Sequence, residues 1–247
     1  MTGGGPRSQC VHNPLSMVFQ VQRIAMDGRI SVAIDGPAGA GKTTVAREVA
    51  RRLGYKYVDS GAMYRAVAWK SLELGVSPSD ESAMTHVSGA MRIDFGGRDG
   101  SHILVDGTDV SKAIRTPEVT KLSSPVSAIS GVRKHLVARQ RQLAEGGGVV
   151  MEGRDIGSVV LPDAEVKVFL TASADERAKR RHAEMQAAGV DVDIGKLKGE
   201  IEERDRRDST REHSPLVRVP DAAVIDTDGE TVDQVVEKIL TLCRERM

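Results

Sequence analysis

Short apolar runs alternate with longer amphipathic stretches along most of the chain, which is typical of an α/β protein. Five runs rich in β-branched residues are bounded by glycine or polar residues, at 29–35, 55–59, 148–152, 166–170 and 222–226. Helical patterns separate most of them, so we expect the runs to form a parallel sheet covered on both faces. The chain is therefore predicted to contain a doubly wound, five-stranded parallel sheet that binds ligands at the carboxyl ends of its strands.

Residues 88–115 follow a different period. Apolar and polar side chains alternate there, and turns at 96–97 and 106–107 divide the run. This pattern predicts a small antiparallel sheet inserted between the second and third strands of the main sheet. Near the end of the chain, Thr231 and Gln234 have the spacing of a capping box, which predicts the start of a final amphipathic helix.

The segment from about 176 to 212 is densely charged, and two interpretations of it stay open. It carries two helical faces of charged residues, formed by Arg177, Arg180, Arg181 and Glu184 and by Arg204, Arg207, Asp208 and Arg211. Such faces are common on solvated helices stabilised by ion pairs between neighbouring turns. They equally suit a lid whose arginines close over a phosphoryl group during transfer.

The first predicted strand leads directly into the sequence G-x-x-x-x-G-K-T, and an amphipathic helix follows it. The loop and the first helical turn comprise Gly36, Pro37, Ala38, Gly39, Ala40, Gly41, Lys42, Thr43 and Thr44. This is a P-loop, whose backbone N–H groups and helix N-terminus hold phosphate oxygens. We expect Lys42 to reach the β- and γ-phosphates of ATP and the Thr43 hydroxyl to help hold Mg²⁺. The motif predicts nucleoside triphosphate binding without specifying the reaction.

Two classes of nucleotide-binding protein are excluded by missing motifs. Asn13 is the only asparagine, so the chain has no Asn-Lys-x-Asp motif to read guanine. Residues 94–96 spell Asp-Phe-Gly, but the His-Arg-Asp loop that accompanies this motif in protein kinases is absent. The chain is therefore neither a GTPase of the common type nor a protein kinase.

Composition narrows the class of protein further. The 247 residues carry 35 Lys and Arg against 35 Asp and Glu, and 3% are aromatic, which disfavours nucleic acid as a partner. No apolar run approaches the roughly 20 residues of a membrane span. Cys10 and Cys243 form neither a disulfide framework nor a metal pattern. We expect a cytoplasmic protein, with residues 1–28 a disordered leader or the product of a mis-assigned start, and a single domain over 29–247.

Six motifs resemble those of the bacterial cytidylate kinases, which phosphorylate CMP and dCMP. They lie at 34–42, 59–65, 107–115, 152–157, 161–164 and 203–211. The resemblance implies ATP as donor, CMP and dCMP as acceptors, Mg²⁺ as cofactor and a monomeric enzyme. It also implies a core of residues 29–60, 146–175 and 214–247, a monophosphate-binding insert over about 61–145 and a lid over about 176–213.

The resemblance further implies roles for individual residues. Those expected at the cytosine ring are Ser60, Arg133 and Asp155. Those expected at the monophosphate and the sugar are Tyr64, Arg65, Arg154, Arg204, Asp208 and Arg211, with Asp208 bonding the ribose. Arg180 and Arg181 match the lid arginines that approach ATP. Together with Lys42 and Arg154, they are the expected catalytic residues.

At two positions the metal contact is less secure than the family pattern implies. Glu152 stands where many family members have Asp; the carboxylate is kept, so a contact with Mg²⁺ through water is expected at a longer reach. At the position of Thr43 the family also uses small residues without a hydroxyl, so its contact with Mg²⁺ is not required by the pattern.

The residues leave rival functions open. A carboxylate at 155 can accept a hydrogen bond from the cytosine amino group, while an arginine and a hydroxyl serve the ring acceptors, which disfavours thymine and uracil. A kinase for dTMP, UMP or shikimate nevertheless remains an alternative. A P-loop ATPase or nucleotide sensor is an alternative of another class, and it predicts ATP hydrolysis without acceptor phosphorylation.

Overall fold

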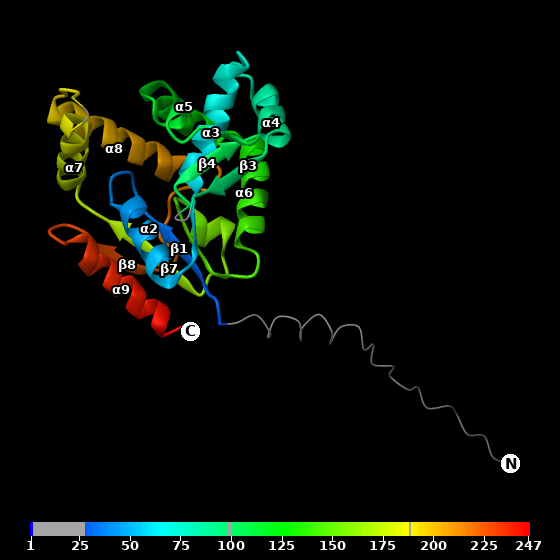
Figure 1. The fold of residues 1–247 in the computed structure, drawn as a ribbon, viewed down its shortest axis with the longest axis vertical. Helices are drawn as coiled ribbons and strands as arrows, with labels where there is room; N and C mark the ends of the chain where they lie inside the picture. The colour runs from blue at the N-terminus through cyan, green and yellow to red at the C-terminus, as the bar shows by residue number, and fades with distance from the viewer. Residues whose placement is uncertain (2–27, 98–99, 188) are drawn as a thin grey trace.

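The computed structural model describes residue 1 and residues 28–97, 100–187 and 189–247. Within these ranges the expected five-stranded parallel sheet is present, in the order β2-β6-β1-β7-β8 (Figure 1). Its strands are β1 (Ser31–Asp35), β2 (Lys56–Asp59), β6 (Val149–Gly153), β7 (Val166–Thr171) and β8 (Ala223–Asp226). Every strand overlaps the run that predicted it. The leader expected over 1–28 falls almost wholly on residues outside the described ranges.

Helices cover both faces of the sheet because successive side chains of a strand point to opposite sides. They are α2 (Lys42–Leu53) and α9 (Val232–Arg244) on one face, and α3 (Ser60–Glu73) and α6 (Ser130–Ala144) on the other. In β1, Val32 and Ile34 pack on the α2 side and Ala33 on the α3 side, all fully buried. Full burial of an aliphatic side chain such as that of Ile34 contributes about 1.5–3 kcal/mol to the stability of the folded protein. Because β1 is the central strand, the P-loop that follows it lies at the middle of the edge formed by the carboxyl ends of the strands.

The expected antiparallel sheet is present between β2 and β6. Its strands are β3 (Ile93–Gly96), β4 (His102–Val105) and β5 (Thr108–Asp109), flanked by α4 (Glu81–Ala90), the 3₁₀ turn η1 (Ala113–Arg115) and α5 (Pro117–Ala128). The predicted range of 88–115 is too wide at both ends, because its first residues complete α4 and its last residues form η1. Asp106 and Gly107 have φ values of 50° and 84°, and two positive φ values match the tight turn of a β-hairpin.

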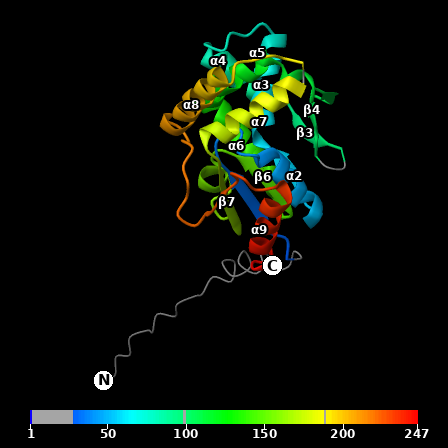
Figure 2. The ribbon, with the colours of Figure 1, turned by 90° about the vertical axis from the view of Figure 1, so that its left-hand side faces the viewer.

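The charged segment folds into two helices, α7 (Ala174–Ala187) and α8 (Ile194–Thr210), which pack against each other. Figures 1 and 2 show α8 running alongside α7, on the side of the molecule away from α9. The residues of the segment differ in their burial. Arg181 and Arg206 are exposed and pair with glutamates three residues away, as on a solvated helix, whereas Arg177 and Asp208 are buried against the rest of the molecule.

The prediction that Arg211 shares a helical face with Arg204 is wrong. The helix α8 ends at Thr210, and Arg211 has extended backbone angles as its C-cap. Its guanidinium nevertheless reaches the carboxyl end of the sheet, where Arg211 Nη2 lies 3.8 Å from Oδ1 of Asp155, while its Nε donates to the Ser214 carbonyl oxygen at 2.6 Å. At the other end of the chain, the capping box of Thr231 and Gln234 is confirmed at the start of α9. None of the described helices combines the length and apolar character needed to cross a membrane.

Candidate active site

The P-loop joins β1 to α2 through three glycines with positive φ. Gly36, Gly39 and Gly41 have φ values of 147°, 79° and 84°. A Cβ atom at Gly36 would lie 2.1 Å from the Leu170 carbonyl oxygen, so a side chain has no room there. The curled backbone ends at the N-terminus of α2, where N–H groups and the helix dipole favour an anion.

Lys42 lies buried at the base of this loop. Its Nζ donates to the Pro37 carbonyl oxygen at 2.7 Å. Burial and, after it, the nearby Arg154 lower the pKa of Lys42 to about 7, although the Glu152 carboxylate opposes the shift. A phosphate oxygen placed against Lys42 would favour the charged amine and raise this pKa.

Glu152, at the end of β6, is held beside Lys42 by hydroxyl groups. Tyr57 donates its hydroxyl proton to Glu152 Oε1 at 2.5 Å, and the Thr43 side chain also hydrogen bonds to this carboxylate. Burial raises the pKa of Glu152, and the neighbouring Asp59 raises it further, whereas Lys42 lowers it. The Glu152 carboxylate, with two hydroxyl groups bonded to it, therefore lies close to the P-loop lysine.

The predicted base-reading residues come together on the other side of the sheet edge. Arg133 Nη2 and Asp155 Oδ2 form an ion pair in which both side chains are buried. The Arg133 guanidinium lies over the Tyr64 ring, 5.5 Å from its centroid, and its Nη1 donates to the Ser127 carbonyl oxygen at 3.1 Å. Ser60 joins the group by donating its hydroxyl proton to the Glu152 carbonyl oxygen at 2.7 Å.

The predicted phosphate-binding arginines gather between these two groups. Arg65 is held by Asp59 at 2.8 Å, and Arg154 by Asp208 at 2.9 Å. Arg204 has its Nε buried without a hydrogen-bond partner, and burial together with the nearby Arg154 lowers its pKa to about 10. Several half-buried guanidinium groups placed together are costly unless an anion offsets their charge, which fits a phosphate site.

The two predicted lid arginines behave differently. Arg180 lies near the P-loop, since a Cβ atom at Gly41 would come within 3.8 Å of its Nη1, and it donates to the side chain and the backbone of Thr227. Arg181 points into solvent and pairs with Glu184 at 3.0 Å. The structure therefore brings Arg180 to the site and leaves Arg181 outside it.

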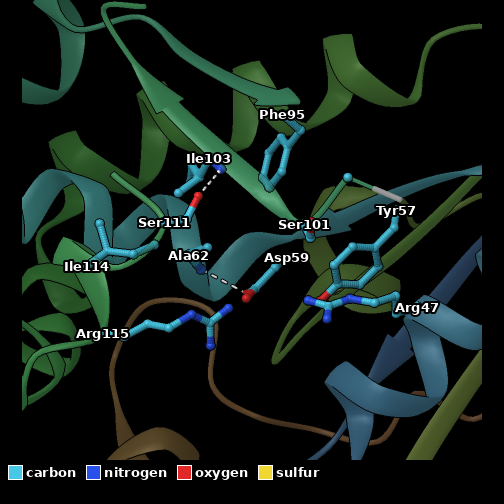
Figure 3. Close-up of a pocket in the computed structure, with 11 residues that line it drawn as sticks. Arg47, Tyr57, Asp59, Ala62, Phe95, Ser101, Ile103, Ser111, Ile114 and Arg115 are labelled. Carbon is cyan, nitrogen blue, oxygen red and sulfur yellow. Dashed lines mark hydrogen bonds between the residues drawn. The ribbon is translucent and has the colours of Figure 1, made fainter. Parts of the chain in front are cut away.

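A small pocket opens beside Asp59, between α3 and the antiparallel sheet (Figure 3). Asp59 accepts from the Ala62 N–H as the N-cap of α3 and also pairs with Arg65. Burial acts to raise the pKa of Asp59, but Arg65, the Ala62 N–H and Arg115 outweigh it and hold the pKa below its ordinary value. The inserted segment thus reaches the phosphate side of the site through Arg115.

Several residues at the site were not predicted from the sequence. Asp35 accepts from the N–H groups of Ile156 and Gly157, at 2.9 and 2.8 Å, and so fastens the turn after Asp155 to the end of β1. Burial raises the pKa of Asp35 to about 6, although these two N–H groups oppose the shift. Tyr57 was not predicted because it lies within a predicted strand. Asp59 begins one of the six family motifs, but no individual role was predicted for it.

The comparisons with known proteins agree with this geometry. Residues 32–245 match the family model described as cytidylate kinase. The chain is 52% identical over 223 residues to the cytidylate kinase of Geobacillus kaustophilus, covering 90% of this chain and 100% of that one. It is 53% identical over 210 residues to that of Desulforamulus reducens, covering 85% and 95%.

Solved structures resemble the chain more distantly. A shikimate kinase from Acinetobacter baumannii covers 90% of this chain and 96% of its own, with 17% identity and a TM-score of 0.47. A likeness at that level carries no argument about substrate. The family model and the sequence relatives confirm the resemblance inferred from the six motifs: the chain belongs to the cytidylate kinase family.

Proposed function

We propose that this enzyme transfers the γ-phosphoryl group of ATP to CMP and dCMP, yielding CDP and dCDP. One observation carries the proposal: a P-loop with a buried lysine and a buried Arg133–Asp155 pair lie at the same edge of one sheet. The first suits a triphosphate, and the second suits a ring with adjacent donor and acceptor groups. The arginines that lie between them suit the γ-phosphate of ATP and the phosphate of CMP, which must come together for transfer.

Cytosine recognition is proposed to divide between donors and acceptors. Asp155 accepts from the N4 amino group, and Arg133 donates to the ring acceptors. The Ser60 proton is already donated to the Glu152 carbonyl oxygen. Its hydroxyl is therefore better placed to accept from the amino group than to serve a ring acceptor, which reverses its expected role. Uracil presents a carbonyl oxygen to Asp155 and Ser60 and is disfavoured.

The monophosphate is proposed to lie among the arginines, with the ribose against Asp208. Its ligands would be Tyr64, Arg65, Arg154, Arg204 and Arg211. The Tyr64 hydroxyl is buried without a hydrogen-bond partner, as are the Arg65 and Arg204 Nε groups and the Arg211 Nη2 group, and such groups suit an anionic ligand. The acceptor oxygen is already ionised near neutral pH, so transfer needs positioning and charge stabilisation rather than a general base.

The residues near Lys42 fit a magnesium ion. This ion is usually held by one or two carboxylates, phosphate oxygens and waters, and Thr43 and Glu152 supply a hydroxyl and a carboxylate in contact with each other. We propose that Thr43 binds the ion and that Glu152 orients one of its waters. When bound, Mg²⁺ would neutralise negative charge that develops on the phosphate groups during transfer.

The division of the chain expected from the sequence is retained as part of the proposal. Residues 29–60, 146–175 and 214–247 would form the core, 61–145 the monophosphate-binding insert and 176–213 the lid. Closure of the lid would exclude water and so suppress hydrolysis of ATP. Arg180 would meet the phosphates from the position it already has, whereas Arg181 would have to leave Glu184.

The test is an ADP-release assay with MgATP and a panel of acceptors: CMP, dCMP, UMP, AMP, GMP, dTMP and shikimate. Products are separated by chromatography, and an acceptor-free reaction is the control. We expect strong CDP and dCDP formation and little ADP without an acceptor. Preferred phosphorylation of another acceptor would refute the base assignment. ATP loss without any phosphorylated product would point to an ATPase or nucleotide sensor instead.

A further inference from the structure

Two carboxylates of α8 each hold an arginine from a different part of the molecule. Asp205 Oδ2 contacts Arg177 Nη1 at 2.6 Å, and Asp208 Oδ2 contacts Arg154 Nε at 2.9 Å. The two aspartates are three residues apart, so they share one face of the helix. Asp208 belongs to the acceptor site proposed above, whereas the sequence analysis assigned no role to Asp205.

Arg177 connects Asp205 to the P-loop. Its Nη1 also donates to the Ala38 carbonyl oxygen at 3.1 Å, and its Nε donates to the Ala172 carbonyl oxygen at 3.1 Å. A Cβ atom at Gly39 would lie 3.1 Å from Arg177 Cβ, so the side chain packs directly on the loop. Because the Arg177 side chain is only 7% exposed, it has little freedom to move without disturbing that backbone.

Arg154 performs the equivalent connection on the acceptor side. It follows β6 directly, its Nη1 donates to the Gly153 carbonyl oxygen at 3.2 Å, and its charge acts on both Lys42 and Arg204. The helix α8 is therefore connected to the P-loop through Asp205 and Arg177, and to the proposed acceptor site through Asp208.

We propose that Asp205 is a positioning residue that, through Arg177, couples the donor site to the acceptor site. CMP holds α8 on the core through Asp208. This reinforces the contact that Asp205 already makes with Arg177 and so holds the P-loop in the shape that binds ATP. Each substrate then raises the affinity for the other by the same factor, as linkage requires. This inference rests on the proposed function for the identity of both substrates.

The matched control is the second ion pair between α7 and α8. Lys198 Nζ contacts Asp175 Oδ1 at 2.7 Å, but these side chains are 39% and 69% exposed and do not contact the P-loop residues named above. Lys198→Gln removes one helix–helix contact without touching Arg177. If the only role of Asp205 were to hold α8 against α7, Asp205→Asn and Lys198→Gln would have the same effect on binding.

The experiment measures the dissociation constant of CMP by titration calorimetry, with and without saturating magnesium adenylyl imidodiphosphate. We expect the ATP analogue to tighten CMP binding by roughly fivefold or more in the unmodified enzyme and in Lys198→Gln, within the usual range of coupling between sites. In Asp205→Asn the ratio is expected to fall to about one, with CMP affinity in the absence of the analogue changed by less than about twofold.

The proposal is overturned if Asp205→Asn keeps the full ratio, or if the unmodified enzyme shows none. It is also overturned if Lys198→Gln loses the ratio equally. Circular dichroism checks that each variant is folded. If Asp205→Asn does not fold, Arg177→Lys is measured in its place. It keeps the positive charge but cannot contact both Asp205 and the Ala172 carbonyl oxygen, so the ratio of the two CMP dissociation constants must fall in this variant too. Failure of the proposed function is a separate result, because an enzyme that makes no CDP fails the acceptor assay whatever its coupling.

Discussion

At the scale of single residues, the site is organised by pairs of unlike charge. Three ion pairs place guanidinium groups in a partly buried region where an unpaired charge would be costly. They are Arg133 with Asp155, Arg65 with Asp59 and Arg154 with Asp208. The same pairs orient the guanidinium groups before a ligand arrives. Replacing one carboxylate should therefore remove a specific contact and also leave a buried arginine without its partner.

Asp155→Asn tests this at the base. We expect the KM for CMP to rise by about 10- to 100-fold, because the charged acceptor of the amino group is replaced by a neutral one and the buried Arg133 loses its ion pair, corresponding to about 1–3 kcal/mol. The KM for ATP should change little. Steady-state kinetics with each substrate varied in turn measure both values, and Asp163→Asn, at an exposed position, is the control. Equal increases in the two KM values would contradict the assignment of Asp155 to the base.

Lys42 gives a prediction about protons. With a pKa of about 7 in the free enzyme, roughly nine-tenths of Lys42 is neutral at pH 8. Phosphate oxygens favour its charged form and raise the pKa, so ATP binding at pH 8 should take up a proton, and uptake should vanish below about pH 6. Calorimetry in buffers of different ionisation enthalpy measures this, and Lys42→Met should abolish it. Proton release in the unmodified enzyme would show that the sign is wrong.

At the scale of elements, the P-loop and the inserted sheet differ in what shapes them. The hairpin turn at Asp106–Gly107 follows from local backbone preference, with both φ values positive. The P-loop is constrained by its neighbours as well, since Gly36 passes against β7 and Gly39 against α7. A glycine in the loop is thus required by packing between elements, and its replacement should disturb more than the turn.

Gly36→Ala is expected to destabilise the protein by about 3 kcal/mol and to abolish ATP binding. Its Cβ would collide with the Leu170 carbonyl oxygen, and its φ of 147° disfavours a side chain. Thermal unfolding and calorimetry report the two effects. Gly199→Ala in α8 is the control, because no atom lies within 4 Å of its Cβ position. An unchanged melting temperature in Gly36→Ala would refute the close approach.

At the scale of the whole molecule, α7 and α8 lie over the sheet edge that carries the P-loop and the acceptor site (Figures 1 and 2). Their exposed ion pairs contribute little to stability, in the range of about 0–1 kcal/mol each. The buried contacts of Arg177 and Asp208 should therefore decide how firmly these two helices, the proposed lid, are held. Substrates that add contacts beneath it should hold it more firmly.

Trypsin measures that effect. Three arginines of the proposed lid are exposed: Arg181, Arg206 and Arg207. Trypsin cleavage after them should slow severalfold when CMP and magnesium adenylyl imidodiphosphate are both present. The reason is that bound ligands lower the population of the open state, in which the protease reaches these residues. Either ligand alone should protect less. Cleavage at the exposed Arg246 is the internal control. Equal cleavage with and without both ligands would show that the lid does not close over them.

The amino-acid sequence by itself determined the strands, the P-loop, the hairpin turn and the capping box of α9. Each rests on neighbours in the chain: periodicity, glycine at positive φ or a side chain reaching back three residues. The structure also brings together most of the residues that the family motifs predicted for the site. The errors lie at element ends, as at Arg211, where local patterns are weakest.

Only the tertiary structure decided the strand order β2-β6-β1-β7-β8 and the pairing of distant charges. Arg177 meets Ala38 across 139 positions of sequence, and Ser60 donates to the Glu152 carbonyl oxygen across 92. No local pattern encodes such contacts, because they depend on how the strands cross and which side chains become buried together. The same reason applies to three features that the sequence did not predict. They are the hydrogen bond that Ser60 donates, the exposure of Arg181 and the connection from Asp205 through Arg177 to the P-loop.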